Sequence, residues 1–252
     1  MVFYFYYMKK ENKIFGIYPI LEALKAEVVI DKLYIQKDIQ NTKIQALILA
    51  AEKIGATINM VPVEKLNRLT KGNHQGVVAI TSPINFPSLE ETVERVLETK
   101  KRPLFIILDQ ISDVRNFGAI LRTAECTGVD AVIIQKKGGA PVSGDTVKTS
   151  AGAIFNIPIC KVDHIKDAIF YLQGSGIKTL AATEKSDETI YSKDLTQPLA
   201  LIMGSEGKGV SKSVLSLVDE AASLPLVGAI NSLNVSVACG AFLYEIVRQR
   251  SL

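Results

Sequence analysis

Three short blocks of the sequence combine polar, chemically capable side chains with glycine. They are D-V-R-N-F-G-A-I-L-R-T-A at Asp113–Ala124, A-L-I-M-G-S-E-G-K-G-V-S at Ala200–Ser211, and L-P-L-V-G-A-I-N-S-L-N-V-S-V-A at Leu224–Ala238. The polar residues stand where an apolar element begins or ends, and the glycines allow a ligand to come close to the backbone. We expect these blocks to form a binding or catalytic site.

The first block follows a predicted strand, Leu104–Leu108, and opens a predicted helix, Gly118–Cys126. Arg122 lies four residues after Gly118, so it projects from the face on which Gly118 has no side chain. The planar guanidinium suits the oxygens of a phosphate or ribose that approaches this face. The alternative is that Asn116 only caps the helix and that Arg122 is a surface residue.

The second block is a glycine-rich turn, Gly204–Gly209, after a predicted strand at Leu199–Met203. It departs from the G-x-x-x-x-G-K-[ST] and G-x-G-x-x-G patterns, which disfavours a nucleotide triphosphatase and a Rossmann dehydrogenase. What remains is a turn that exposes its backbone and carries one carboxylate, Glu206. A plain loop is the alternative.

The third block places four hydrogen-bonding side chains at the mouth of an apolar helix predicted at Leu233–Arg250: Asn231, Ser232, Asn234 and Ser236. One cap residue is enough to accept hydrogen bonds from the free N–H groups of a first helical turn. Asparagine and serine inside a helix lower its stability. The excess of polar residues favours a ligand at the helix N-terminus. Alternatively, one residue caps the helix and the others face water.

The elements around these blocks predict two domains. Residues 9–82 alternate helical and strand patterns and form a small α/β unit, and residues 83–102 contain prolines and a charged amphipathic run, typical of a linker and a first helix. Residues 103–252 form the larger domain. Near-continuous apolar runs there predict a parallel sheet covered on both faces, with strands at Leu104–Leu108, Ala131–Ile134, Lys178–Ala182 and Leu199–Met203.

Composition narrows the class of protein. With 252 residues, 48% hydrophobic and 22% charged, the chain is typical of a soluble globular protein, and a net charge of +3 permits a nucleic-acid partner without requiring one. The three cysteines form no C-x-x-C pair, which favours a reducing compartment, and two histidines give no metal cluster. The apolar Met1–Met8 is too short to span a membrane and lacks the features of a signal peptide. We expect a cytoplasmic protein without metal or membrane partner.

In this order, the three blocks resemble the signature motifs of the TrmH (SpoU) branch of the SPOUT superfamily, RNA methyltransferases that act on ribose 2′-hydroxyls. The resemblance covers about Pro103–Arg250. Before it, F-G-I-Y-P-I-L-E-A-L at Phe15–Leu24 and H-Q-G-V-V-A at His74–Ala79 resemble the substrate-binding domain of bacterial 23S rRNA guanosine 2′-O-methyltransferases. The family residues are matched at Asn116, Gly118, Arg122, Gly204, Glu206, Gly207, Ser232 and Asn234.

The resemblance implies an α/β fold whose last segment threads a loop into a deep trefoil knot, a homodimer, and an RNA-gripping N-terminal domain. It also implies that S-adenosylmethionine binds in the knot, in a pocket made by Thr183, Met203, Gly204, Gly207, Leu224, Leu226, Ser232 and Leu233. The expected activity is 2′-O-methylation of structured RNA, a guanosine of 23S rRNA in particular. A tRNA 2′-O-methyltransferase and a non-catalytic RNA-binding protein are the alternatives.

The same resemblance suggests roles for five catalytic residues. The family favours Arg122 as the base, but a guanidinium hardly deprotonates, so we assign Arg122 to binding the acceptor ribose and its phosphate. Asn116 would orient Arg122 or the ribose, and Glu206 would organise the pocket. Ser232 and Asn234 would hold the cofactor or the acceptor. The general base stays open.

Overall fold

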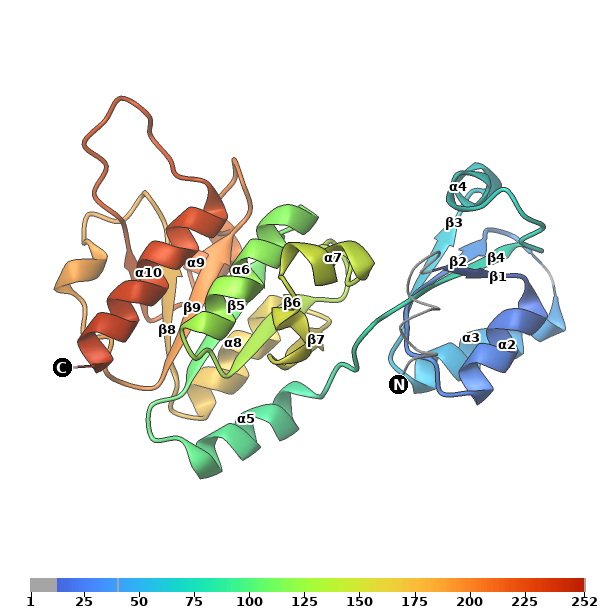
Figure 1. Ribbon diagram of the computed structural model, residues 1–252, viewed down its shortest axis with the longest axis horizontal. Helices are drawn as coiled ribbons and strands as arrows, with labels where there is room; N and C mark the ends of the chain where they lie inside the picture. The colour runs from blue at the N-terminus through green and yellow to red at the C-terminus, as the bar shows by residue number, and fades with distance from the viewer. Residues whose placement is uncertain (1–12, 40, 252) are drawn as a thin grey trace. The chain divides into compact units, whose positions relative to one another are not determined.

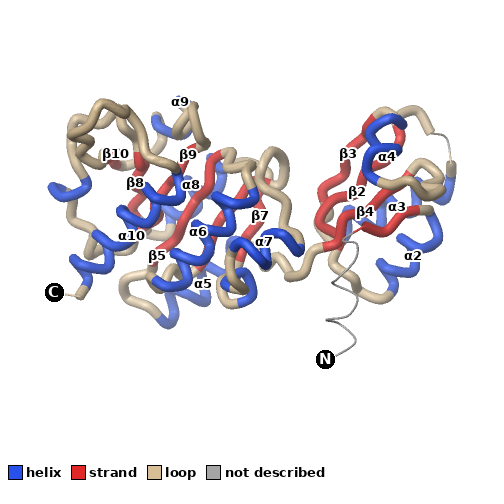
Figure 2. Tube along the Cα trace, turned by 45° about the horizontal axis from the view of Figure 1, so that its top comes forward, coloured by secondary structure: helices blue, strands red, loops and turns tan. Residues whose placement is uncertain are grey.

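The computed structural model describes residues 13–39 and 41–251 (Figure 1, Figure 2). The chain divides into two compact units: the first extends to Asn85 and includes residues 142–144, and the second comprises residues 86–141 and 145–252. Among the described residues, no helix combines the length and the apolar character that a membrane crossing needs. The sequence interpretation of Met1–Met8 lies outside the described residues.

The first unit contains β1 (Lys13–Phe15), α2 (Ile17–Lys25), β2 (Ile30–Gln36), α3 (Thr42–Lys53), β3 (Thr57–Val61), α4 (Val63–Leu69) and β4 (Val77–Thr81). Its mixed sheet has the order β1-β4-β2-β3, with β4 antiparallel to β1 and β2, and β2 parallel to β3. Helices α2 and α3 bury Ile20 and Leu47 in a core shared with the sheet. Gly55 follows α3 in a left-handed conformation, with φ of +69°.

The two motifs of the first unit meet at the start of α2. Gly16 precedes this helix with φ of +88°, and the backbone N–H of Ile17 donates to Oε1 of Gln75 at 3.1 Å. His74 Nδ1 accepts from the N–H of Gly76 at 3.0 Å, which holds the turn that carries Gln75. Gln75 therefore caps α2 from a distant part of the chain.

The second unit contains α5 (Leu89–Thr99), β5 (Leu104–Asp109), α6 (Val114–Cys126), β6 (Ala131–Gln135), α7 (Gly144–Thr149), η1 (Ala153–Phe155), β7 (Ile159–Val162), α8 (Ile165–Gly174), β8 (Lys178–Ala182), η2 (Ile190–Ser192), β9 (Leu199–Gly204), α9 (Lys212–Leu215), β10 (Glu220–Ala222) and α10 (Val235–Arg250). Its sheet is parallel throughout, in the order β10-β8-β9-β5-β6-β7. Helices α5 and α8 cover one face, and α6 and α10 pack together on the other (Figure 1). The prediction of a parallel sheet covered on both faces is confirmed.

The sequence patterns did not predict β1, β7 and β10. All three are edge strands of only three or four residues. An edge strand pairs with one neighbour and is partly exposed, so it needs no long apolar run. Their absence from the prediction follows from this position.

Two helices near the expected site begin at other residues than predicted. Helix α6 starts at Val114 rather than at Gly118, because the carboxylate of Asp113 accepts from the N–H groups of Arg115 at 2.9 Å and Asn116 at 2.8 Å. The prediction that Asn116 opens or caps this helix was therefore wrong. Helix α10 starts at Val235, so residues 231–233 precede it in a loop.

Gly118 has a packing role rather than the predicted role of admitting a ligand. It is buried in α6, and a Cβ at this position would lie 2.0 Å from Oγ1 and 2.7 Å from the carbonyl carbon of Thr149. Thr149 Oγ1 also donates to the carbonyl of Val114 at 3.2 Å. The glycine thus allows α6 to pack directly on the end of α7.

Arg250 fastens the end of α10 to the base of the sheet. Its half-buried guanidinium donates to four carbonyl oxygens, at distances between 2.7 and 3.3 Å, from Arg102, Pro103, Leu195 and Gln197. Desolvation by burial lowers the pKa of this arginine from its usual value. These contacts fix the helix whose other end reaches the candidate site.

Candidate active site

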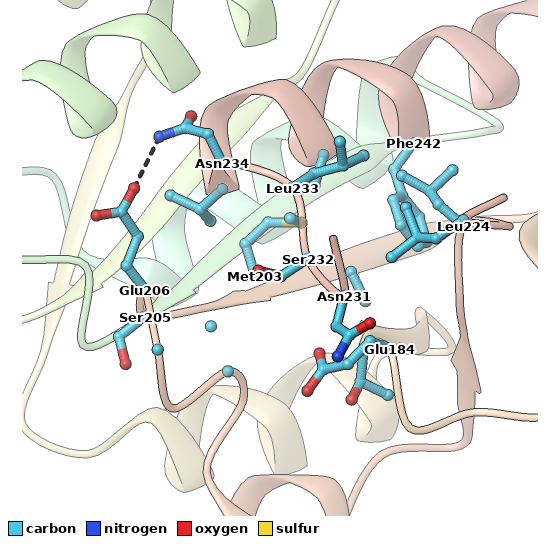
Figure 3. A pocket seen from close by; sticks show the side chains of 18 residues that line it. Glu184, Met203, Ser205, Glu206, Leu224, Asn231, Ser232, Leu233, Asn234 and Phe242 are labelled. Carbon is cyan, nitrogen blue, oxygen red and sulfur yellow. Dashed lines mark hydrogen bonds between the residues drawn. The ribbon is translucent and has the colours of Figure 1, made fainter. Parts of the chain in front are cut away.

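A cavity of about 540 Å³ opens at the carboxyl ends of β8 and β9 (Figure 3). Its walls come from three segments: residues 182–184, residues 203–209, and residues between 224 and 242 that lead into and along α10. The parallel pairing of Ala181 with Ile202 brings the first two segments side by side. The volume lies within the range of about 300–1,000 Å³ that is common for small-molecule sites.

Glycines shape the turn after β9. A Cβ on Gly204 would lie 2.0 Å from the backbone of Gly209 and Val210, so only glycine allows the returning chain to cross the end of this strand. Gly207 and Gly209 have φ of +79° and +67°, and the N–H of Gly209 donates to the carbonyl of Ser205 at 2.9 Å. The result is a compact turn whose backbone lines the cavity.

Three side chains from the three sequence blocks form a hydrogen-bond network at one end of the cavity. The amide of Asn116 donates to Oε1 of Glu206 at 2.8 Å, and the amide of Asn234 donates to the same oxygen at 2.7 Å and to Oδ1 of Asn116 at 3.0 Å. Oδ1 of Asn234 meanwhile accepts from the N–H of Ser236 at 3.0 Å and caps α10. Asn234 therefore caps α10 and also lines the cavity.

The charges and the apolar wall of the cavity indicate the kind of ligand it suits. Among the described residues that line it, the charged ones are both acidic, Glu184 and Glu206. Met203, Leu224 and Phe242 supply apolar surface (Figure 3). A ligand with a positive charge and a flat or apolar portion matches this combination.

The residues predicted from the sequence fall into two groups. All those expected to bind the cofactor line the cavity: Thr183, Met203, Gly204, Gly207, Leu224, Leu226, Ser232 and Leu233. Of the expected catalytic residues, Asn116, Glu206 and Asn234 form the network, and Ser232 lines the cavity.

Arg122 stands apart from the other expected catalytic residues. It is exposed on α6 and makes no hydrogen bond or ion pair with the residues that the structure describes. Arg122 lies six positions after Asn116, which corresponds to about 9 Å along the helix axis. Arg122 is therefore free to contact a ligand outside the cavity.

Three polar residues of the cavity were assigned no role from the sequence: Glu184, Ser205 and Asn231. Asn231 belongs to the third block but received no role. Glu184 lies in T-E-K-S-D-E, a polar stretch without glycine or periodicity. The available signal was its position directly after Thr183, at the carboxyl end of a parallel strand, where ligands bind in open α/β sheets.

Comparison with known families agrees with this fold. Residues 103–244 match the model of the SpoU rRNA methylase family, and residues 13–87 match the model described as RNA 2′-O ribose methyltransferase substrate binding. The chain belongs to the SpoU rRNA methylase family.

Individual relatives match along nearly the whole chain. A putative TrmH family tRNA/rRNA methyltransferase, YacO from Bacillus subtilis, is 32% identical and covers 96% of this chain and 98% of its own. The 23S rRNA (guanosine-2′-O-)-methyltransferase RlmB of Photorhabdus laumondii is 35% identical, with coverage of 94% and 98%.

Solved structures have the same fold. The SpoU methyltransferase AviRb from Streptomyces viridochromogenes, in complex with AdoMet, matches with a TM-score of 0.61 at 22% identity, covering 98% of this chain and 97% of its own. The TrmH/SpoU tRNA modifying enzyme of A. aeolicus matches with a TM-score of 0.55 at 30% identity, covering 65% of this chain and 84% of its own.

The protein is thus an RNA 2′-O-methyltransferase that depends on S-adenosylmethionine. The cavity suits this cofactor in charge and in its apolar surface. S-adenosylmethionine carries a sulfonium, an ammonium and one carboxylate, so its net charge is positive, and its adenine is flat and largely apolar. Two glutamates and an apolar wall are the matching features of this chain.

Proposed function

We propose that this enzyme methylates the ribose 2′-hydroxyl of a guanosine in 23S rRNA. In this proposal residues 103–252 bind the cofactor and perform the reaction, residues 9–82 grip the RNA, and residues 83–102 supply the linker and first helix. The network of Asn116, Glu206 and Asn234 carries the proposal, because it joins the three sequence blocks at one end of the cavity.

The reaction needs a hydroxyl oxygen held in line with the methyl–sulfur bond of the cofactor, which supplies an electrophilic methyl group. Asn116 and Asn234, held by Glu206, orient the polar end of the cavity, and Ser232 offers a further hydroxyl there. Arg122 binds the phosphate or ribose of the acceptor nucleotide outside the cavity, where its exposed fork is unengaged. Much of the acceleration then comes from positioning.

One observation supports rRNA as the substrate, and a second supports an RNA substrate in general. The relative named for 23S rRNA guanosine methylation matches over 94% of this chain, whereas the tRNA modifying enzyme of A. aeolicus matches over 65%. The first unit also exposes cations at Lys65 and Arg68 on one face of α4 and at Lys71 in the following loop. Such cations suit a phosphate backbone. A tRNA substrate and a non-catalytic RNA-binding protein are the alternatives.

The proposal includes a homodimer, a trefoil knot in the last part of the chain and a cytoplasmic location. Support for the dimer comes from α10, which exposes Val237 and Tyr244, 57% and 59% accessible, two helical turns apart. Sedimentation velocity at micromolar concentration tests the dimer, and Tyr244→Glu should shift a dimer toward monomer.

Methylation assays on separate RNAs test the function. The purified protein is incubated with S-adenosylmethionine and with unmodified 23S rRNA, 16S rRNA or tRNA, and 2′-O-methyl groups are mapped at nucleotide resolution. We expect one guanosine of 23S rRNA to be methylated by the wild type and not by Arg122→Ala. Methylation of tRNA alone would select the first alternative. Cofactor binding without methylation of any RNA would contradict the proposed substrate class.

A further inference from the structure

We propose that Glu184 binds the vicinal hydroxyls of the cofactor's ribose, which rests on the proposed binding of S-adenosylmethionine in the cavity. Glu184 follows Thr183 at the carboxyl end of β8 and lines the cavity (Figure 3). The proposed mechanism gives this carboxylate no other role. It would determine affinity for the nucleoside part of the cofactor rather than the methyl transfer itself.

Glu184 lies against the glycine turn that follows β9. Strand β8 pairs with β9, which ends in the turn at residues 204–209. Oε2 of Glu184 lies 3.9 Å from the place that a Cβ on Gly209 would occupy, so the carboxylate lies against this turn. In dinucleotide-binding folds, a carboxylate near the glycine-rich turn binds ribose hydroxyls in the same way.

Hydrogen bonds hold the backbone on both sides of Glu184, whereas its carboxylate is unengaged. The N–H of Thr183 donates to the carbonyl of Ala222 at 2.9 Å, and Oγ1 of Thr183 accepts from the N–H of Lys185 at 3.3 Å. The carboxylate of Glu184 makes no hydrogen bond or ion pair with any described residue. The other carboxylate of the cavity, Glu206, already accepts from two amides.

The chemistry of the cofactor selects the ribose. A carboxylate only accepts hydrogen bonds, and its two oxygens match two adjacent hydroxyl donors. The ribose joins the adenine to the sulfonium, and Glu184 lies beside Asn231 on the side of the cavity away from Glu206 (Figure 3). The ammonium and the adenine amine are the other donors of the cofactor, and the experiment distinguishes them.

Calorimetric binding of S-adenosylhomocysteine, which cannot transfer a methyl group, tests the proposal. Glu184→Gln should weaken binding by about tenfold, because a hydrogen bond to a charged group is replaced by one to a neutral amide. Asp187→Asn is the matched control: it removes an exposed carboxylate three residues away that does not line the cavity, and it should leave binding unchanged. Circular dichroism checks that both variants are folded.

Ribose-modified ligands give the decisive comparison. The 2′-deoxy and 3′-deoxy analogues should bind the wild type about tenfold more weakly, and Glu184→Gln should cause little further loss with them. Methylthioadenosine, which keeps the hydroxyls but lacks the ammonium, should remain sensitive to Glu184→Gln. This inference, but not the cavity assignment, would be overturned if Glu184→Gln bound S-adenosylhomocysteine as tightly as the wild type. It would also be overturned if the losses of affinity from Glu184→Gln and from removing a ribose hydroxyl were fully additive. Failure of the wild type to bind S-adenosylhomocysteine would overturn the cavity assignment with it.

Discussion

The amide of Asn234 lies 2.7 Å from Oε1 of Glu206, while the oxygen of the same side chain caps α10. One residue therefore connects the start of the terminal helix to the glycine turn after β9. A change at Asn234 affects helix stability and cavity geometry together, and suitable substitutions separate the two effects.

Asn234→Asp keeps an oxygen for the cap but replaces the amide donor by a second carboxylate beside Glu206. We expect thermal stability near that of the wild type and turnover lower by about tenfold or more at pH 8, because the two carboxylates repel. Lowering the pH protonates one of them, so the activity relative to wild type should recover. Asn234→Ala should instead lose about 1 kcal/mol of stability and show no such recovery. A pH-independent defect in Asn234→Asp would contradict this account.

Arg122 is exposed and unengaged, so its substitution should leave the fold intact. Arg122→Lys keeps the charge but loses the bidentate fork, and turnover should fall by about a hundredfold or more. The affinity for S-adenosylhomocysteine should change little, because Arg122 does not line the cavity. Arg115→Lys, at an exposed arginine of the same helix, is the control and should retain most of the activity. Near-normal turnover of Arg122→Lys would make Arg122 an ordinary surface residue.

Gly118→Ala should destabilise the second unit by about 1–3 kcal/mol, because the added Cβ overlaps Thr149 and α6 must move away from α7. Denaturant unfolding measures this loss. Gly174→Ala is the control: a Cβ at the end of α8 meets nothing within 4 Å, so stability should stay equal or rise slightly. Equal stability of Gly118→Ala and the wild type would show that the packing of α6 on α7 is loose.

The cysteines should differ in reactivity. Burial raises the pKa of Cys160 and raises that of Cys239 to about 12, so neither forms a thiolate in the folded protein at neutral pH. Cys126 is exposed. Thiol titration should therefore detect at most one reactive cysteine before denaturation and three afterwards. Modification of Cys239 in the native protein would contradict the packing of α10 on the sheet.

The sequence by itself determined the parallel sheet, most helices and the three polar, glycine-containing blocks that contribute to the cavity. Apolar runs report burial on both faces of a strand, and the ends of parallel strands are where polar residues and glycines gather. The resemblance to a family then assigned the three blocks to one site. These features depend on local sequence, and so a single chain sufficed to predict them.

Only the tertiary structure decided which side chains meet. Asn116 and Glu206 are 90 positions apart, and Asn116 and Asn234 are 118 apart, so their contacts depend on strand order and helix packing. The same reason explains the role of Gly118 against Thr149, the separation of Arg122 from the network, and the place of Glu184 in the cavity. A local pattern specifies the burial and backbone of a residue, whereas its distant partners are set by how the elements pack.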